Sequence, residues 1–256
     1  MRFSVIIPVF NNKEWLPKCF DSILSQTFTD YEVIIVNDMS TDGNKEIIKL
    51  YKPRFIEKCK GVKIINNKTK RLNGGSRNVG IAEAKGDYII SIDCDDYFID
   101  NKVFDDINNK LIDEDIMLLD YQVHTKNYDV NCCQHFNSID EAIHGYTCAL
   151  WAKVVKRKFL LNNLQKEGTL FEDMGHHFRL MLNCKSFVCL GRVTHVWNRL
   201  NANSISNMKQ YAYYRFNFCG EMYELLQSMP QSETRNYLKS KLMEYLKLCN
   251  EMADNL

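Results

Sequence analysis

Four short apolar segments in the first part of the chain, which alternate with stretches of helical periodicity, constrain the fold more than any other feature. The segments Phe3–Val9, Tyr31–Val36, Val62–Ile65 and Tyr88–Ile92 are rich in β-branched residues and are typical of buried strands. Strands that alternate with helices in this way predict an α/β fold with a largely parallel sheet.

The segments between these strands carry signals for helix ends. Asn11 or Asn12 is a candidate cap for the first helix, and Pro53 is expected to end the second. A polar, glycine-rich loop over Lys68–Gly75 is expected to precede a short helix over Ser76–Lys85.

The alternation is less regular in the second half of the chain. We expect strands over Ile116–Tyr121 and Phe187–Val196 and a helix that starts near Glu172. Gln210–Leu256 has helical periodicity with a break near Pro230. No stretch has the composition of a linker, so we expect the C-terminal helices to pack against the sheet.

Composition excludes several classes of protein. The chain of 256 residues has 33 Lys and Arg against 32 Asp and Glu, and a net charge of +1 argues against a nucleic-acid binder. No apolar run approaches the roughly 20 residues that span a bilayer, and the N-terminus lacks the apolar core of a signal peptide. The 10 Cys are scattered without a C-x-x-C pair. We therefore expect the thiols to be reduced and the protein to be cytoplasmic, either free in the cytoplasm or in peripheral contact with the inner face of a membrane.

Polar residues follow each predicted strand. Ligands of an open parallel sheet bind in the crevice beyond the carboxyl ends of its strands. The residues at those ends are Asn11, Asp38, the segment Gly74–Asn78, Asp93 and Asp95. Carboxylates beside glycine and arginine indicate that a cation and an anionic ligand could share this crevice.

The acidic and glycine-rich segments each have two interpretations. Asp93 and Asp95 suit a divalent cation whose shell is completed by substrate phosphate oxygens, and such a metal would neutralise a diphosphate leaving group. The alternative is a solvated acidic turn. Gly74–Asn78 would let a helix N-terminus approach an anion, with Arg77 meeting a phosphate or a base, or it is an ordinary loop and cap.

Two adjacent acids begin the helix predicted near residue 172. Glu172 or Asp173 could be a general base, or both could be there for the helix dipole. His176 and His177 follow, and one of them could be a ligand, although surface or core histidines are commoner.

The order and spacing of these motifs resemble the family 2 glycosyltransferases of the GT-A fold over about residues 3–206. The resemblance implies an α/β fold with a Rossmann-like, mostly parallel central sheet flanked by helices and with a C-terminal helical appendage. We therefore expect a catalytic domain over residues 1–206 and a helical extension over 207–256 packed on it. The matching segments are Ile6–Asn11, Val36–Asp42, Ser76–Gly80, Ile92–Asp96, Trp151–Lys153, Phe171–Asp173, Arg199 and Ser204–Ser206.

The family implies transfer of a sugar from a nucleotide-sugar donor, usually a UDP-sugar, to an acceptor hydroxyl of a glycan or lipid-linked precursor, with inversion at the anomeric carbon. By motif position, Asp173 would be the catalytic base, Glu172 would touch the acceptor or donor sugar, and Asp95 would hold Mn²⁺ or Mg²⁺. The implied nucleotide-sugar contacts are Pro8, Val9 and Asn11 in the nucleoside pocket, Asp38 on the uracil, Arg77 on the nucleotide and Asp93 on the ribose or donor sugar.

Further residues each have more than one interpretation. Trp151 could stack on an acceptor sugar or belong to the core, Arg199 could meet the diphosphate or pack, and His195 could be a further metal ligand. The basic run Lys153–Lys158 could meet a phosphorylated acceptor or form a solvated face. The aromatic run Tyr211–Phe218 could pack in the core, form a homodimer through the C-terminal helices or contact a membrane surface.

Two other functional classes share parts of this pattern. A sugar-phosphate nucleotidyltransferase favours a glycine-rich loop after the first strand, and the loop Pro8–Lys13 has no glycine. A non-catalytic glycan-binding protein has no need of Asp38, Asp95 and Asp173 together, and all three are present. Both observations favour the transferase.

Overall fold

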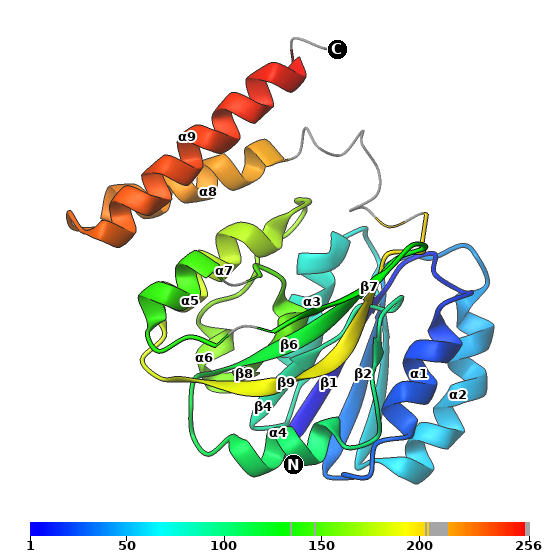
Figure 1. The fold of residues 1–256 in the computed structure, drawn as a ribbon. Helices are drawn as coiled ribbons and strands as arrows, with labels where there is room; N and C mark the ends of the chain where they lie inside the picture. Colours follow the sequence, from blue (N-terminus) through cyan, green and yellow to red (C-terminus); the bar gives the residue numbers. More distant parts are fainter. Residues whose placement is uncertain (134, 146, 203, 205–214, 254–256) are drawn as a thin grey trace.

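The computed structural model describes residues 1–133, 135–145, 147–202, 204 and 215–253, which form an α/β structure around one sheet (Figure 1). Within the described residues the sheet has nine strands in the order β3-β2-β1-β4-β8-β6-β9-β5, with β7 paired to β6. The strands are β1 (Phe3–Val9), β2 (Tyr31–Asn37), β3 (Gly61–Asn66), β4 (Tyr88–Ser91), β5 (Tyr97–Phe98), β6 (Ile116–His124), β7 (Asp129–Cys132), β8 (Lys153–Lys156) and β9 (Phe187–Asn198).

The first four strands form a parallel half-sheet and confirm the predicted alternation. β1 pairs with β2 and β4, and β2 pairs with β3, all in parallel register. Every residue of β1 and β2 is buried, because both faces of these strands are covered, and such strands read as continuous apolar runs. The sheet continues through β8, which is antiparallel to β4 and β6, and then through β9, which is parallel to β6.

Helices cover both faces of the sheet (Figure 1). One core packs α1, α2 and α4 against the face that carries Phe3, Val5 and Ile7. The other packs α3, α5, α6 and α7 against the face that carries Ile6 and Ile34. The helices are α1 (Leu16–Leu24), α2 (Asn44–Lys58), α3 (Leu72–Glu83), α4 (Val103–Lys110), α5 (Ile139–Gly145), the 3₁₀ turn η1 (Leu150–Ala152), α6 (Arg157–Leu161), α7 (Glu172–Asn183), α8 (Arg215–Ser228) and α9 (Glu233–Ala253).

The prediction that Asn11 or Asn12 caps α1 is wrong. The helix begins at Leu16 with Trp15 in the cap position, and no side chain caps it. The Asn12 carbonyl accepts hydrogen bonds from the amides of Trp15 and Leu16. Asn11 Oδ1 accepts one from the amide of Thr41 at 2.8 Å. The Asn11 side chain therefore joins the loops after β1 and β2, and the helix starts after an intervening turn.

Pro53 does not end α2, which continues to Lys58. A proline inside a helix removes one backbone hydrogen bond and costs about 3 kcal/mol. Ile48, Tyr51 and Phe55 lie on one face of the helix on both sides of the proline, and all three are buried. Burial of that face against the sheet offsets the cost and keeps the helix continuous.

Helix α3 begins at Leu72, earlier than the predicted start at Ser76, so Gly74 lies in its first turn and not in a loop. A Cβ atom on Gly74 would lie 2.7 Å from Cγ of Glu172 and 2.8 Å from the carbonyl oxygen of Lys166. Glycine is required here because the start of α3 packs directly on the start of α7. This contact brings two of the predicted motifs together.

The hairpin of α8 and α9 packs over α5 and α7 (Figure 1). Met222 of α8 and Leu238 of α9 are buried in the same apolar cluster as Phe178 of α7. The predicted break near Pro230 is confirmed, since it lies between the two helices. Tyr211, Tyr213 and Tyr214 of the aromatic run, and the side chains of Phe216 and Phe218, lie outside what the structure describes. No described helix is both long enough and apolar enough to cross a membrane.

Candidate active site

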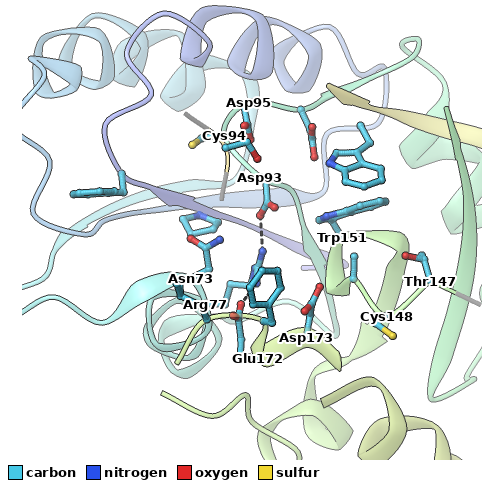
Figure 2. A pocket seen from close by; sticks show the side chains of 18 of the residues that line it. Asn73, Arg77, Asp93, Cys94, Asp95, Thr147, Cys148, Trp151, Glu172 and Asp173 are labelled. Atoms are coloured by element: carbon cyan, nitrogen blue, oxygen red, sulfur yellow. Dashed lines mark hydrogen bonds and ion pairs between the residues drawn. The ribbon is translucent and has the colours of Figure 1, made fainter. Parts of the chain in front are cut away.

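A cavity of about 300 Å³ opens at the carboxyl ends of β1 and β4, where the polar strand-end residues were expected to meet (Figure 2). The turn after β4, the N-termini of α3 and α7, the segment before η1 and the end of β9 surround it. Of the predicted site residues, those that line it are Pro8, Arg77, Asp93, Asp95, Trp151, Glu172 and Asp173. Those outside this lining are Val9, Asn11, Asp38, His195 and Arg199.

The acidic turn after β4 is crowded and largely withdrawn from water. Asp95 Oδ2 accepts a hydrogen bond from Nδ2 of Asn201 at 2.7 Å, and Asp96 Oδ1 accepts one from the amide of Asn198 at 2.8 Å. Burial, and then the neighbouring charge of Asp93, raise the pKa of Asp95 to about 6. Burial together with Asp95 and Asp93 also raises the pKa of Asp96. This turn therefore favours a ligand that brings positive charge.

Arg77 joins the two acidic parts of the cavity (Figure 2). Its guanidinium donates a hydrogen bond from Nη2 to Asp93 Oδ1 at 2.5 Å and another from Nη1 to Glu172 Oε1 at 2.9 Å. The Arg77 side chain is 4% exposed and that of Glu172 is 7% exposed. Burial opposes the charge of Arg77, but Asp93 and Glu172 outweigh it and raise the pKa of the arginine. Arg77 thus holds the turn after β4 and the start of α7 at a set separation.

The two acids at the start of α7 have different surroundings. Glu172 is buried and paired with Arg77, whereas Asp173 is half-buried and lines the cavity. Burial raises the pKa of Glu172 to about 7, with Asp173 raising it further and Arg77 lowering it. Burial also raises the pKa of Asp173, and the charges of Arg77 and Lys153 oppose that rise. A half-buried carboxylate with a raised pKa is suited to accept a proton.

The predicted nucleoside residues mainly organise the loops beside the cavity. Asp38 is buried, and its carboxylate accepts hydrogen bonds from Nδ2 of Asn67 at 2.8 Å and from the amides of Arg71 and Leu72, each at 2.9 Å. Its burial is outweighed by these bonds and by Lys70, so the pKa of Asp38 is lowered. The carboxylate thereby ties the end of β2 to the start of α3.

The residues predicted for the nucleoside pocket have different positions, and only one of Pro8, Val9 and Asn11 lines the cavity. Pro8 lines the cavity, while the Val9 side chain is buried in the core that packs α1 and α2. Asn11 has a positive φ of 49°, and its amide donates to Oγ of Ser40 at 3.1 Å. Pro8 and Val9 are the last two residues of β1, where alternate side chains face opposite sides of the strand, and Asn11 lies in the loop that follows.

Aromatic side chains form the wall opposite Arg77 (Figure 2). Trp151 and Trp197 both line the cavity, with ring centroids 5.7 Å apart. Behind them, His195 lies 4.8 Å from Trp151 and 5.9 Å from Tyr121 between ring centroids. The guanidinium of Arg199 lies 4.6 Å from the Trp197 ring centroid. The wall therefore has both aromatic surface and a cation at its edge.

The histidines considered as ligands are buried and belong to the structure around the cavity. His195 Nδ1 lies 2.8 Å from Oγ1 of Thr194, and burial lowers the pKa of His195 to about 3. Burial likewise lowers the pKa of His176, to about 3, and its Nε2 lies 2.6 Å from the Asn163 carbonyl oxygen. Burial also lowers the pKa of His177. The lowered pKa values favour the neutral form of all three, and none lines the cavity in the described part of the chain.

The basic run of residues 153 to 158 does not form one shared surface. Lys158 is exposed, in keeping with a solvated face, whereas the other basic residues are partly or fully buried. Lys153 is buried, Lys156 pairs with Asp113 at 2.6 Å, and Arg157 Nε donates to the Gly86 carbonyl at 2.9 Å. Lys153 and Lys156 lie three residues apart in β8 and so point to opposite faces, and Arg157 is the first residue of α6.

Three asparagines at the acidic turn escaped the sequence-based predictions. Asn201 donates both to Asp95 and to Oδ1 of Asn12, the latter at 2.9 Å. Asn198 donates from Nδ2 to the Asp95 carbonyl at 3.1 Å. For Asn198 and Asn201 the available signal was the asparagine-rich stretch at the end of β9, but the acidic turn that they contact lies about a hundred residues away in the sequence.

The residues of the acidic turn fit a divalent cation when a ligand shares its coordination. In the described residues no group of three or more His, Cys, Asp and Glu side chains is arranged to hold a metal ion. Asp95 is nonetheless partly buried beside Asp93, and burial together with that charge raises its pKa. Mg²⁺ is commonly bound by one or two carboxylates together with phosphate oxygens and water.

Comparison with known proteins adds a family to this geometry. The sequence model of the family described as Glycosyl transferase family 2 matches residues 4–178. A poly(ribitol-phosphate) beta-glucosyltransferase of Bacillus spizizenii is 37% identical over 99 residues, which are 38% of this chain and 15% of that protein. The matches to the first three curated relatives span between 14% and 40% of their lengths.

Solved structures share the fold. Staphylococcus aureus TarS (1-349), in complex with UDP-GlcNAc, aligns with a TM-score of 0.76 at 18% identity over 96% of this chain and 72% of that chain. The mannosyltransferase PcManGT from Pyrobaculum calidifontis, in complex with GDP-Man and Mn²⁺, aligns with a TM-score of 0.69 at 14% identity over 94% of this chain and 69% of that chain. At these identities the likeness shows the GT-A fold, as the sequence resemblance implied.

Proposed function

The chain belongs to glycosyl transferase family 2, and we propose that it moves a sugar from a nucleotide-sugar donor to an acceptor hydroxyl with inversion at the anomeric carbon. The single observation that carries this proposal is the cavity in which the acidic turn after β4 and the half-buried Asp173 lie on two sides, joined by Arg77. Such a displacement needs charge stabilisation on the leaving-group side and a base on the acceptor side.

Asp173 is the proposed general base. It takes the proton of the acceptor hydroxyl while the acceptor oxygen forms a bond to the anomeric carbon. The bond from that carbon to the diphosphate oxygen breaks, and its electron pair leaves with the nucleoside diphosphate. Asp173 suits this task because it lines the cavity, whereas the carboxylate of Glu172 is paired with Arg77. Glu172 is therefore proposed to orient the start of α7 next to the sugar.

A UDP-sugar is the proposed donor, with Mn²⁺ or Mg²⁺ as the cofactor and Asp95 as its protein ligand. The bound metal would neutralise charge on the leaving diphosphate. Asp93, on the same side of the cavity, is proposed to face the ribose or donor sugar. Pro8, Asn11 and Asp38 are proposed to form the nucleoside end. Support comes from the UDP-GlcNAc and Mn²⁺ complexes of the structural neighbours.

The acceptor is proposed to be a glycan or lipid-linked precursor that approaches from the aromatic wall. Trp151 and Trp197 offer ring faces for a sugar, and Arg199 lies at the edge of that wall. Both tryptophans line the same cavity as Asp173, so an acceptor hydroxyl held there would lie on the side of the base.

We extend the proposal to the organisation of the chain. Residues 1–206 would form the catalytic domain, and residues 207–256 a helical extension packed on α5 and α7. The exposed Tyr223 and Met243 of α8 and α9 are available for a homodimer contact through these helices. A cytoplasmic location, with peripheral membrane contact to reach a lipid-linked acceptor, would suit this activity.

Donor binding tests the proposal first. We expect calorimetry to show that Mn²⁺ strengthens UDP binding to the parent protein and that Asp95→Ala removes this metal dependence. Asp113→Ala is the matched control, because the Asp113 side chain is 83% exposed and lies away from the cavity lining. If the affinity of the parent for UDP does not depend on Mn²⁺, and Asp95→Ala binds UDP with the same affinity, the assigned metal site is refuted.

Turnover tests the reaction. A panel of UDP-sugars is incubated with Mn²⁺, and released UDP is measured with and without candidate glycan acceptors. We expect metal-dependent release from at least one donor. Metal-dependent UDP binding without release from any sugar nucleotide or transfer to any acceptor would favour the non-catalytic glycan-binding alternative.

A further inference from the structure

Lys153 is a buried lysine that the proposed reaction does not use. It is the first residue of β8, and it is 1% exposed. Its Nζ donates to the carbonyl oxygens of Thr147 at 2.8 Å, Cys148 at 3.4 Å and Ala149 at 2.9 Å. One ammonium group therefore forms hydrogen bonds to three consecutive backbone carbonyls of the same segment.

That segment forms part of the cavity wall. Thr147, Cys148 and Ala149 all line the cavity, next to Trp151 and on the same side as Asp173 (Figure 2). The segment is irregular and precedes the short turn η1, so its own backbone bonds do not hold it as a helix or strand would. Its position depends on the contacts made from behind, where Lys153 lies.

A buried ammonium is costly to keep, and its charge reaches the proposed base. Burial lowers the pKa of Lys153 to about 8, and the nearby Cys148 and Asp173 raise it. In return, Lys153 is one of the charges that lower the pKa of Asp173. The groups that act on this lysine and aspartate from the surrounding elements are Arg77 of α3, Asp93 after β4, Cys148 before η1, and Glu172, His176 and His177 of α7.

We propose that Lys153 is a positioning residue, which holds the segment of residues 147 to 149 in place as the acceptor-side wall of the cavity, on the same side as Asp173. This inference rests on the proposed function, because it assigns the wall to the acceptor and the base to Asp173. Lys153 itself lies behind the wall and does not touch the substrate. Two features of one side chain, its donors and its charge, thus support the same half of the site.

Three variants separate the donors from the charge. Lys153→Met removes both, Lys153→Gln keeps two N–H donors without the charge, and Lys153→Arg keeps both donors and charge. Lys156→Met is the matched control from the same strand, because Lys156 is partly exposed and pairs with Asp113 at the surface. UDP binding, which uses the other side of the cavity, reports whether each variant folds.

The first readout does not depend on activity. Alkylation of Cys148 is followed by peptide mass spectrometry and divided by that of Cys133, which is exposed in the same protein. We expect Cys148 to react about ten times faster in Lys153→Met, because the segment loses its anchor, and to stay near the parent rate in Lys153→Arg and Lys156→Met. Loss of the Lys153 charge acts in the opposite direction, because that charge lowers the pKa of Cys148 and so favours its reactive thiolate. A faster reaction therefore reports exposure of the segment. An unchanged ratio in both Lys153→Met and Lys153→Gln would overturn the positioning role.

The second readout is the pH dependence of transfer. Loss of the positive charge raises the pKa of Asp173, so the acid limb of kcat should move to higher pH in Lys153→Met and Lys153→Gln, and stay in place in Lys153→Arg. A shift of one pH unit corresponds to about a tenfold loss of rate on the acid limb. We also expect KM for the acceptor to rise in Lys153→Met while KM for the donor is unchanged.

The outcomes separate this inference from the proposed function. A parent protein without transferase activity would refute the proposed function, and the Cys148 ratio would still decide the contact with the segment. An active parent whose Lys153→Gln variant keeps the acid limb would refute the charge effect on Asp173. If Lys153→Met does not fold, the comparison of Lys153→Gln with Lys153→Arg tests the proposal, since both variants retain N–H donors for the carbonyls.

Discussion

Replacement of Arg77 by methionine tests whether the bridge between the two acidic parts of the cavity holds the site together. Methionine keeps most of the aliphatic volume and removes the charge. Glu172 and Asp93, whose side chains are 7% and 24% exposed, would both lose their partner. Removal of one partner from a buried ion pair costs about 3–5 kcal/mol, because the remaining charge stays buried without compensation. We expect Arg77→Met to lose that amount of unfolding free energy near pH 8.

The loss should depend on pH with a defined sign. Burial raises the pKa of Glu172 from its ordinary 4.5 to about 7 with Arg77 in place, and Arg77 is a group that lowers it. Without Arg77 the folded-state pKa is higher still. A carboxyl with a raised folded pKa loses its stability contribution as pH rises from its unfolded pKa through its folded pKa. The part of the loss that comes from Glu172 therefore builds up above pH 7 and is absent near pH 5.

The assay is urea unfolding of parent and variant at about pH 5.5 and about pH 8, with the slope compared to exclude a change in the unfolded state. Arg71→Met is the matched control, since the Arg71 and Glu167 side chains of its ion pair are 40% and 47% exposed. An exposed pair contributes about 0–1 kcal/mol. Arg77→Met within 1 kcal/mol of the parent near pH 8, or a loss in Arg71→Met of equal size, would refute the reasoning.

Three further predictions concern single residues. Asp173→Asn should keep UDP binding but reduce kcat for transfer by about 10²–10⁴, as measured by UDP release, while Asp113→Asn keeps the parent rate; transfer at the parent rate in Asp173→Asn would reassign the base. Gly74→Ala should lose about 1–3 kcal/mol in urea unfolding, because its Cβ would lie 2.7 Å from Glu172 Cγ. Gly220→Ala, whose Cβ has nothing within 4 Å, should not be destabilised; equal losses would contradict the close contact. Burial lowers the pKa of His195 to about 3, so the contribution of the neutral imidazole to folding stability is lost as pH falls below its unfolded value near 6.5. Between about pH 7 and pH 5, the melting temperature should therefore fall less in His195→Gln than in the parent. An identical fall in both proteins would show that His195 is not held neutral.

The regular part of the fold could be predicted because its signal is local. β1 and β2 are buried and largely apolar runs, and the start of α7 lies at Glu172 as expected. β5 has two residues and β8 has four, too few for a period to be visible. Pro53 misled the prediction for α2, because a local helix breaker was outweighed by burial of Phe55 against the sheet. The sequence placed Lys153 in a basic run, but in the structure its side chain is buried.

The candidate site divides in the same way. Asp93, Asp95 and Asp173 were singled out from their positions at the ends of predicted elements, and all three line one cavity. Asn198 and Asn201, which bind the acidic turn, were missed because their partners are remote in sequence. The assigned catalytic and ligand roles remain predictions for the variants above to test.

The sequence by itself determined the parallel half-sheet and the edge at which its ligands would bind, because hydrophobic periodicity and the alternation of strands with helices are properties of neighbouring residues. Only the tertiary structure decided which polar groups lose water and which partners they find. Arg77 meets Glu172 across 95 positions of sequence because Gly74 lets α3 and α7 touch. Lys153 is buried because its ammonium finds three carbonyls behind the cavity wall. Such pairings depend on desolvation and close approach, which arise when distant elements pack.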